Sequence, residues 1–255
     1  MSSAVLAKPF RGIGEFFAMS LDTFVQMFRR PWAWREFIFQ AWFVARVALV
    51  PTILLSIPFT VLTSFTINIL LVEIGAADFS GSGAAVATVT QTGPIVTVLV
   101  VAGAAATAMC ADLGARTIRE ELDALRVLGI NPIQALVVPR VAAATVVSLL
   151  LTALVCLVGI AGGFFFSVFF QGVTPGAFAA GLTLLVGTPQ VVAALLKAAV
   201  FGLAASLIAC YKGIFVGGGA QGVGNAVNET VVYTFMALFV INVLATAVAV
   251  KAGAS

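Results

Sequence analysis

The densest group of charged side chains in this sequence lies in its middle, between two long apolar stretches. Seven of the 15 residues from Asp112 to Arg126 are charged, whereas the whole chain of 255 residues has 13 basic and 10 acidic residues. Their spacing predicts one continuous helix with two i,i+4 ion pairs, Arg116–Glu120 and Arg119–Asp123. Charges of both signs can fix the register of a helix on a soluble protein. The pattern therefore predicts that this segment recognises a protein surface.

The same segment has an apolar stripe, made of Ile118, Leu122 and Leu125, and is predicted to end at Gly129, with Pro132 beyond it. A plain loop needs only turn residues, so this stripe indicates a helix that lies against another protein. A solvated or lipid-skimming helix fits the pattern equally well. The acidic residues favour the protein partner, because an anionic membrane surface would repel them.

Several kinds of catalytic chemistry are excluded by what the sequence lacks. It has no histidine, which rules out an imidazole base, a histidine metal ligand and a Ser-His pair. No lysine follows a glycine, so the run from Gly217 to Gly224 is predicted to be a flexible turn, not a phosphate-binding loop. Cys110, Cys156 and Cys210 have no metal-binding spacing and are predicted to pack in apolar regions. The chain is therefore expected to be no enzyme and to bind no cofactor itself.

Four polar residues are predicted to lie inside membrane-spanning helices and could line a path for a lipid: Asn68, Gln91, Lys197 and Asn242. Lys197 is the one basic residue well inside a span, about 12 Å from Pro189 at 1.5 Å per residue. Such a cation suggests a contact with an anionic lipid headgroup or an acidic partner residue. Snorkelling to the membrane surface explains Lys197 equally well, and hydrogen bonds between helices explain the other three.

Membrane helices must position these residues, because the sequence is 62% hydrophobic and only 9% charged. This composition predicts an all-α integral membrane protein. Its apolar runs predict five transmembrane helices, near residues 42–72, 83–110, 141–170, 189–211 and 229–250. The apolar segment from Ala177 to Val186 is too short to cross and is predicted to be interfacial or re-entrant; a sixth crossing would put the C-terminus on the opposite side. Glu229 is predicted to cap the start of the last span.

The region before the first span predicts an amphipathic helix that lies on the membrane. Between Glu15 and Phe37, apolar and polar residues recur on different faces at helical spacing, and Pro31 would end the helix. Tryptophan and arginine residues gather here, as they do at a membrane surface. With five spans, the basic residues before span 1, between spans 2 and 3, and after span 4 share one side, which the positive-inside rule makes the cytoplasm. We expect one domain, with residues 1–40 as a cytoplasmic interfacial region and residues 42–250 as the five-span bundle.

Two blocks of the sequence are similar to those of a known family: IREELDALRVLGINPIQALVVPR, from Ile118 to Arg140, and CYKGIFVGGGAQGVGNAVNETVVY, from Cys210 to Tyr233. They resemble the MlaE/YrbE permease family, the membrane subunits of Mce-type lipid ABC transporters, and most of all the A-type YrbE subunit of actinobacteria, which include mycobacteria. In that family the charged segment between spans 2 and 3 is a cytoplasmic coupling helix that fits into a cleft on an ATPase. The resemblance assigns ATPase coupling to Arg116, Arg119, Glu120, Glu121, Asp123 and Arg126.

The resemblance also implies partners and a function. The chain would form a heterodimer with a B-type YrbE permease, sit on a cytoplasmic ATPase dimer that binds ATP and Mg, and meet Mce substrate-binding proteins on the outer side. It would import a fatty acid, sterol or phospholipid across the cell membrane, with its N-terminus in the cytoplasm. The alternative is a stand-alone ion-coupled carrier, which should have acidic residues deep in its spans. Glu73, Asp78 and Glu229 lie near span ends, which counts against that alternative.

Overall fold

The computed structural model describes residues 3–29, 32–76 and 79–251, and within these ranges the chain is helical with no strand. Five helices in this part of the chain are long and apolar enough to cross a membrane: Trp34–Glu73 (α2), Ser80–Ile118, Ile133–Gln171, Thr188–Ile214 (α9) and Gly219–Lys251 (α10). The predicted number of spans is therefore confirmed. The helix Pro175–Leu185 (α8) has 11 residues, which is too short for a sixth crossing.

Two of the five spans contain short π-helical segments, whose turns are wider than those of an α-helix. The second span consists of α3 (Ser80–Val86), α4 (Gly93–Val100) and α5 (Ala106–Ile118), joined by the π-helical segments η2 (Ala87–Thr92) and η3 (Val101–Ala105). The third span begins with a similar segment, η4 (Ile133–Val137), and continues as α7 (Val138–Gln171). Segments of this kind occur often at functional sites, so η2 and its neighbours are of particular interest.

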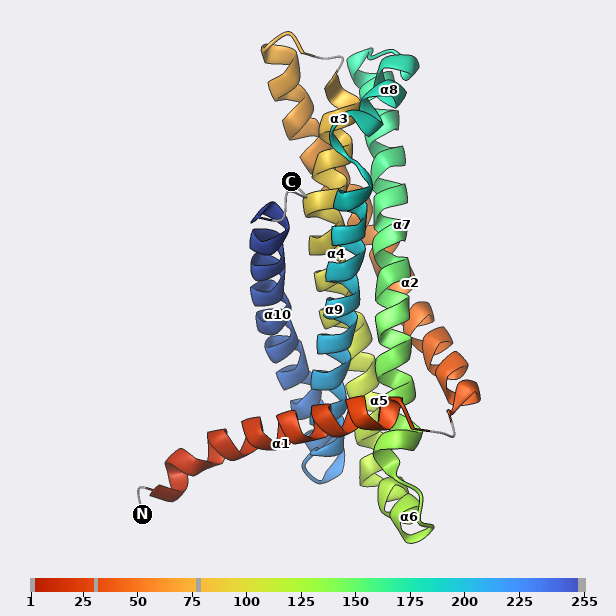
Figure 1. Cartoon of the computed structure of the whole chain (residues 1–255), viewed down its shortest axis with the longest axis vertical. Helices are drawn as coiled ribbons and strands as arrows, with labels where there is room; N and C mark the ends of the chain where they lie inside the picture. Colours follow the sequence, from red (N-terminus) through yellow and green to blue (C-terminus); the bar gives the residue numbers. More distant parts are fainter. Residues whose placement is uncertain (1–2, 30–31, 77–78, 252–255) are drawn as a thin grey trace.

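The helices extend beyond the apolar runs that predict them. The 40 residues of α2 give a helix about 60 Å long, roughly twice the thickness of the hydrocarbon core. Figure 1 shows that α2, α7 and α8 reach farther at one end of the bundle than α9 and α10 do. We call this the α8 end, and we call the opposite end, where α1 and α6 lie, the α6 end.

At the α8 end, α8 packs directly on α3. A Cβ atom on Gly81 would lie 2.1 Å from the carbonyl oxygen of Phe178, so only glycine permits this approach of the two backbones. Phe178 itself is buried, at 1% exposure. The short apolar segment therefore packs on one end of the bundle instead of forming a sixth span.

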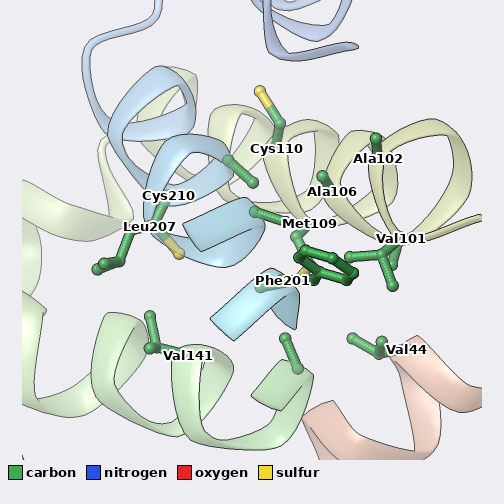
Figure 2. Packing of buried hydrophobic residues seen from close by; sticks show 14 of the residues in the cluster. Val44, Val101, Ala102, Ala106, Met109, Cys110, Val141, Phe201, Leu207 and Cys210 are labelled. Atoms are coloured by element: carbon green, nitrogen blue, oxygen red, sulfur yellow. The ribbon is translucent and has the colours of Figure 1, made fainter. Parts of the chain in front are cut away.

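The apolar core lies toward the α6 end, where α2, α5, α7 and α9 meet. Figure 2 shows Phe201 of α9 beside Val101 and Met109, with Val44 of α2 and Val141 of α7 facing it from their own helices. All five residues are almost fully buried. Since membrane helices gain little from the hydrophobic effect within lipid, such close packing is a main source of their association.

Along the bundle, α2 packs on α7 through a line of small and polar residues. Every fourth residue of α2 is buried, in the order Gln40, Val44, Ala48, Thr52, Ser56, Thr60, Ser64 and Asn68. Opposite this line, a Cβ atom on Gly163 of α7 would lie 3.3 Å from Ser64 Oγ. Small residues let two helix backbones approach closely. The side-chain oxygens of Thr60 and Ser64, and Asn68 Oδ1, are buried without a hydrogen-bond partner.

The N-terminal helix α1 (Ser3–Met27) lies across the α6 end of the bundle (Figure 1). The helix expected from Glu15 onward begins earlier, at Ser3, and ends at Met27, and α2 begins at Trp34. Pro31, which was predicted to end the helix, lies outside the described residues. Buried residues such as Met19 and Thr23 face the bundle, whereas Phe17 and Leu21 are 59% and 65% exposed. The apolar face of α1 is thus directed away from the protein.

Candidate functional site

The charged segment between the second and third spans does not form one continuous helix, as the sequence pattern predicts. It is divided into α5, which ends at Ile118, and α6 (Glu121–Val127). Between them, Glu120 has a φ of 60°, the left-handed conformation, which costs a non-glycine residue about 1–2 kcal/mol. Thr117 Oγ1 at the end of α5 donates a hydrogen bond of 3.0 Å to Gly213 O. This contact holds α5 against α9, so the chain must turn before α6 can pack elsewhere.

The break at Glu120 also changes the ion pairs. Arg116 pairs with Asp112 at 3.4 Å, and Arg119 pairs with Glu121 at 3.3 Å. The predicted i,i+4 pairs, Arg116–Glu120 and Arg119–Asp123, are therefore wrong, because the turn moves the second member of each pair off the shared face. Asp123 instead pairs with Arg126 at 2.7 Å, within α6.

The apolar stripe of α6 packs on this chain itself. Leu122 is 4% exposed and belongs to the same buried cluster as Met19 of α1, and Leu125 is partly buried against that cluster. The surface that α6 leaves free consists of the Asp123–Arg126 pair, with both side chains more than 60% exposed, and of Val127 and Leu128 at 88% and 73%. In Figure 1 this helix projects beyond α1 at the end of the molecule. Any protein that contacts α6 would meet charged groups and a small apolar tip.

A buried ion-pair cluster at the start of this segment was not predicted from the sequence. Arg140 is 0% exposed, and its Nη2 lies 2.5 Å from Asp112 Oδ2. Its Nη1 donates to Leu136 O at 2.8 Å and lies 3.9 Å from Glu36 Oε1, which also accepts a bond from Gln40. The guanidinium thus joins α2, α5 and α7. The sequence did contain a signal for this pair. Asp112 lies two residues after the second predicted span, and Arg140 lies one residue before the third, so both lie at the same level of the membrane.

Two smaller predictions about the α6 end are also wrong. Glu229 does not cap a helix, because α10 begins at Gly219, ten residues earlier; it pairs with Lys212 of α9, whose Nζ lies 2.5 Å away. The run from Gly217 to Gly224 is not a flexible turn throughout, since Gly219 and the residues after it are helical. The ammonium of Lys212 also lies 4.4 Å from the centre of the Tyr233 ring, so α9 and α10 are joined side by side.

The four polar residues predicted inside the spans separate into two places. Gln91 and Lys197 line one cavity of about 220 Å³, together with Thr246. Asn242 lies one turn before Thr246, whose Oγ1 donates to Asn242 O at 2.7 Å, but it does not line the cavity. Asn68 belongs to the contact between α2 and α7, where its Nδ2 donates to Ser167 Oγ at 2.8 Å.

The cavity lies between the second span, α9 and α10. Lys197 is 7% exposed, and its Nζ donates a hydrogen bond of 2.9 Å to Thr246 Oγ1. Snorkelling does not describe this geometry, because the amino group ends on a neighbouring helix. Valine and alanine side chains form most of the remaining wall. The arrangement can hold a small polar group in an otherwise apolar part of the bundle.

Five long apolar spans, with a charged helix that projects from one end, define a multi-pass membrane protein. The chain belongs to the Permease MlaE family, which matches residues 37–248. It is 34% identical over 180 residues to a "Probable ABC transporter permease protein" of Synechocystis, covering 70% of this chain and 68% of that one. It is 29% identical over 244 residues to a protein of the same description from Rickettsia bellii, with 92% and 91% covered.

A plant protein is also similar. The chain is 34% identical over 147 residues to "Protein TRIGALACTOSYLDIACYLGLYCEROL 1, chloroplastic" of Arabidopsis thaliana, which covers 58% of this chain and 42% of the plant protein. The family and its named members identify the chain as a permease subunit of an ABC-type transporter, which works with a separate ATPase. A stand-alone carrier, the alternative considered from the sequence, does not agree with this family.

Proposed function

We propose that this chain is the membrane-spanning subunit of an ATP-driven lipid transporter, and that its α6 couples the bundle to the ATPase. The observation that carries the proposal is the position of α6, which projects from the bundle with an exposed Asp123–Arg126 pair. The chain enters α6 from α5 and leaves it toward α7, and Arg140 joins these two helices to each other and to α2 through Asp112 and Glu36. A movement of α6 on the ATPase would therefore be transmitted to α2, α5 and α7.

A lipid substrate is supported by the interior of the bundle. Lys197 lines a cavity well inside the spans, and the walls around this ionisable side chain are mostly apolar. A sugar or an ion would need a more polar lining. The similar protein of Arabidopsis thaliana is named after a lipid, trigalactosyldiacylglycerol, and this name agrees with a lipid substrate.

The orientation that we propose places the α6 end in the cytoplasm of the cell. Arg116, Arg119, Arg126 and Lys212 are all found there, as the positive-inside rule requires. The exposed apolar face of α1, which includes Phe17 and Leu21, fits a helix that lies in the membrane surface. Import, a B-type YrbE partner and Mce proteins on the outer side belong to the same proposal and rest on the sequence resemblance.

Charge reversal on α6 tests the coupling role. The variant carries Glu121→Lys and Asp123→Lys; the matched control carries Glu73→Lys, an exposed acidic residue at the α8 end. Each would be produced with its partner permease and ATPase and purified through a tag on this chain. We expect at least tenfold less ATPase to copurify with the α6 variant than with the control, because like charges would then face each other across the contact with the ATPase. Full retention would contradict the proposal.

The orientation has its own measurement. A Val127→Cys variant places a thiol at the most exposed apolar residue of α6. In intact cells, a membrane-impermeant maleimide should leave this thiol unlabelled, and opening the cells should expose it. Labelling in intact cells would place α6 outside and would overturn the proposed coupling.

A further inference from the structure

Lys197 is a cation inside the membrane-spanning part of the protein that lacks a counter-ion. It is the tenth residue of α9 (Thr188–Ile214), about 14 Å from the start of that helix at 1.5 Å per residue. No carboxylate of the described residues lies within 4.0 Å of its Nζ. An ammonium group has three donors, and the bond to Thr246 Oγ1 uses one of them.

The surroundings of Lys197 provide further groups that can bind an anion. The cavity of about 220 Å³ is also lined by Thr90 and Gln91 of η2 and by Gln190 of α9. Gln190 Oε1 accepts a bond from Gly187 N, which leaves its amide nitrogen as a donor. Binding sites for small ligands typically combine apolar walls with a few polar groups that converge on one point, and this cavity has that form.

A second, more apolar space adjoins the first. A groove of about 470 Å³ runs between α2 and the second span, and it shares Val86, Thr90 and Gln91 with the cavity at Lys197. Its other lining residues are Leu62, Thr63, Thr66 and Ile67 of α2 and Ala87 of η2. The shared residues place a polar cavity beside an apolar groove, which is the arrangement that a headgroup joined to an acyl chain requires.

We infer that the cavity at Lys197 binds the anionic headgroup of a lipid, a carboxylate or a phosphate, while the acyl chain lies in the groove beside α2. The amino group of Lys197 would supply the counter-charge, and the side-chain amides of Gln91 and Gln190 would orient the oxygens. The cavity of about 220 Å³ has room for a carboxylate or phosphate group with its nearest carbons.

An acidic side chain of a partner subunit is the other possible counter-ion, and the structure favours the lipid. Three elements of this chain, η2, α9 and α10, already enclose Lys197, and the adjoining groove needs an apolar occupant. Only the role of this cavity in transport rests on the proposed lipid-transport function. Binding is a separate property that can be measured without ATP.

The test uses the complete complex of this chain with its partner subunits, stripped of lipid in detergent. Oleate, dioleoylphosphatidic acid, dioleoylphosphatidylcholine and inorganic phosphate are titrated separately, and bound lipid is counted by native mass spectrometry. Lys197→Met removes the charge with little change of volume and does not leave a buried polar group. Lys197→Arg keeps the charge, and Lys251→Gln is the matched control, since this exposed lysine ends α10.

We expect oleate or phosphatidic acid to bind to the unaltered complex and to the Lys251→Gln variant, and to bind at least tenfold more weakly after Lys197→Met. Lys197→Arg should restore most of this affinity. Equal binding of phosphatidylcholine, unchanged binding after Lys197→Met, or saturation by inorganic phosphate alone would overturn the inference. So would a crosslink between Lys197 and a partner carboxylate. If ATP-driven transport continues while Lys197→Met has no effect on binding, the headgroup site is wrong and the transport function stands.

Discussion

Two buried cations in this bundle have opposite environments. Arg140 is fully buried, and Asp112, Glu36 and a backbone carbonyl surround its guanidinium. Lys197 is 7% exposed and has one hydroxyl for a partner. Burial of a charge is costly unless it is paired. A buried cation with its own carboxylates thus joins helices, whereas one without them is placed to receive an anion.

The largest effect should follow from removing the paired cation. Arg140→Met leaves Asp112 with only the partly exposed Arg116 as a partner and should destabilise the protein by about 3 kcal/mol, at the lower end of the usual range because Asp112 is 30% exposed. Adding Asp112→Leu should recover much of this loss, since no uncompensated carboxylate then remains at that position. Unfolding in detergent measures both. A double variant as unstable as the single one would show that Arg140 acts through packing alone.

A smaller effect should follow from giving Lys197 the counter-ion that it lacks. Thr246 Oγ1 lies 2.9 Å from Lys197 Nζ, so the carboxylate of Thr246→Asp can reach the same amino group. We expect it to compete with the lipid anion and to weaken lipid binding about tenfold, or about 1.4 kcal/mol. Thr246→Asn is the neutral control and should bind lipid nearly as well as the unaltered protein. If Thr246→Asp and Thr246→Asn bound lipid with equal affinity, a counter-ion at Lys197 would have no effect on binding. The proposed difference between Lys197 and Arg140 would then be wrong.

The smallest effect should be the change in stability on removing the unpaired cation. Lys197→Met deletes one hydrogen bond but also a charge in the membrane interior, and these two contributions oppose each other. We expect the free energy of unfolding to change by less than about 1 kcal/mol, in contrast to Arg140→Met. Thermal unfolding of the two variants in the same detergent makes the comparison. A large loss in the lysine variant would mean that Lys197 is as structural as Arg140.

The spans themselves could be predicted because a run of apolar residues long enough to cross a bilayer has few other uses. The ends of the helices could not, since polar residues continue α2 from Trp34 and α10 from Gly219. The turn at Glu120 depends on the hydrogen bond from Thr117 to Gly213, 96 residues away, and local spacing contains no information on it. The positive-inside rule counts Arg140 with the solvated arginines, although it is buried.

The candidate site was only partly accessible from the sequence. Lys197 and Gln91 could be selected, because polar residues in apolar runs are uncommon. Their meeting in one cavity could not, since it depends on how η2 faces α9 and α10. Asn68 looked equivalent to them in the sequence, and only the packing of α2 on α7 separates it.

The line of small residues on α2 has a mechanical consequence. Its hydroxyl-bearing members, Thr52, Ser56, Thr60 and Ser64, repeat at a constant interval of four residues. One helical turn is about 5.4 Å, so translating α2 along α7 by a turn would bring each of these groups close to where its neighbour had been. Because the oxygens of Thr60 and Ser64 have no partner in the present arrangement, such a displacement would break none of their bonds. The same displacement would break the contacts of Glu36 with Arg140 and of Asn68 with Ser167, so these two contacts near the ends of the line hold the first span in its position along α7.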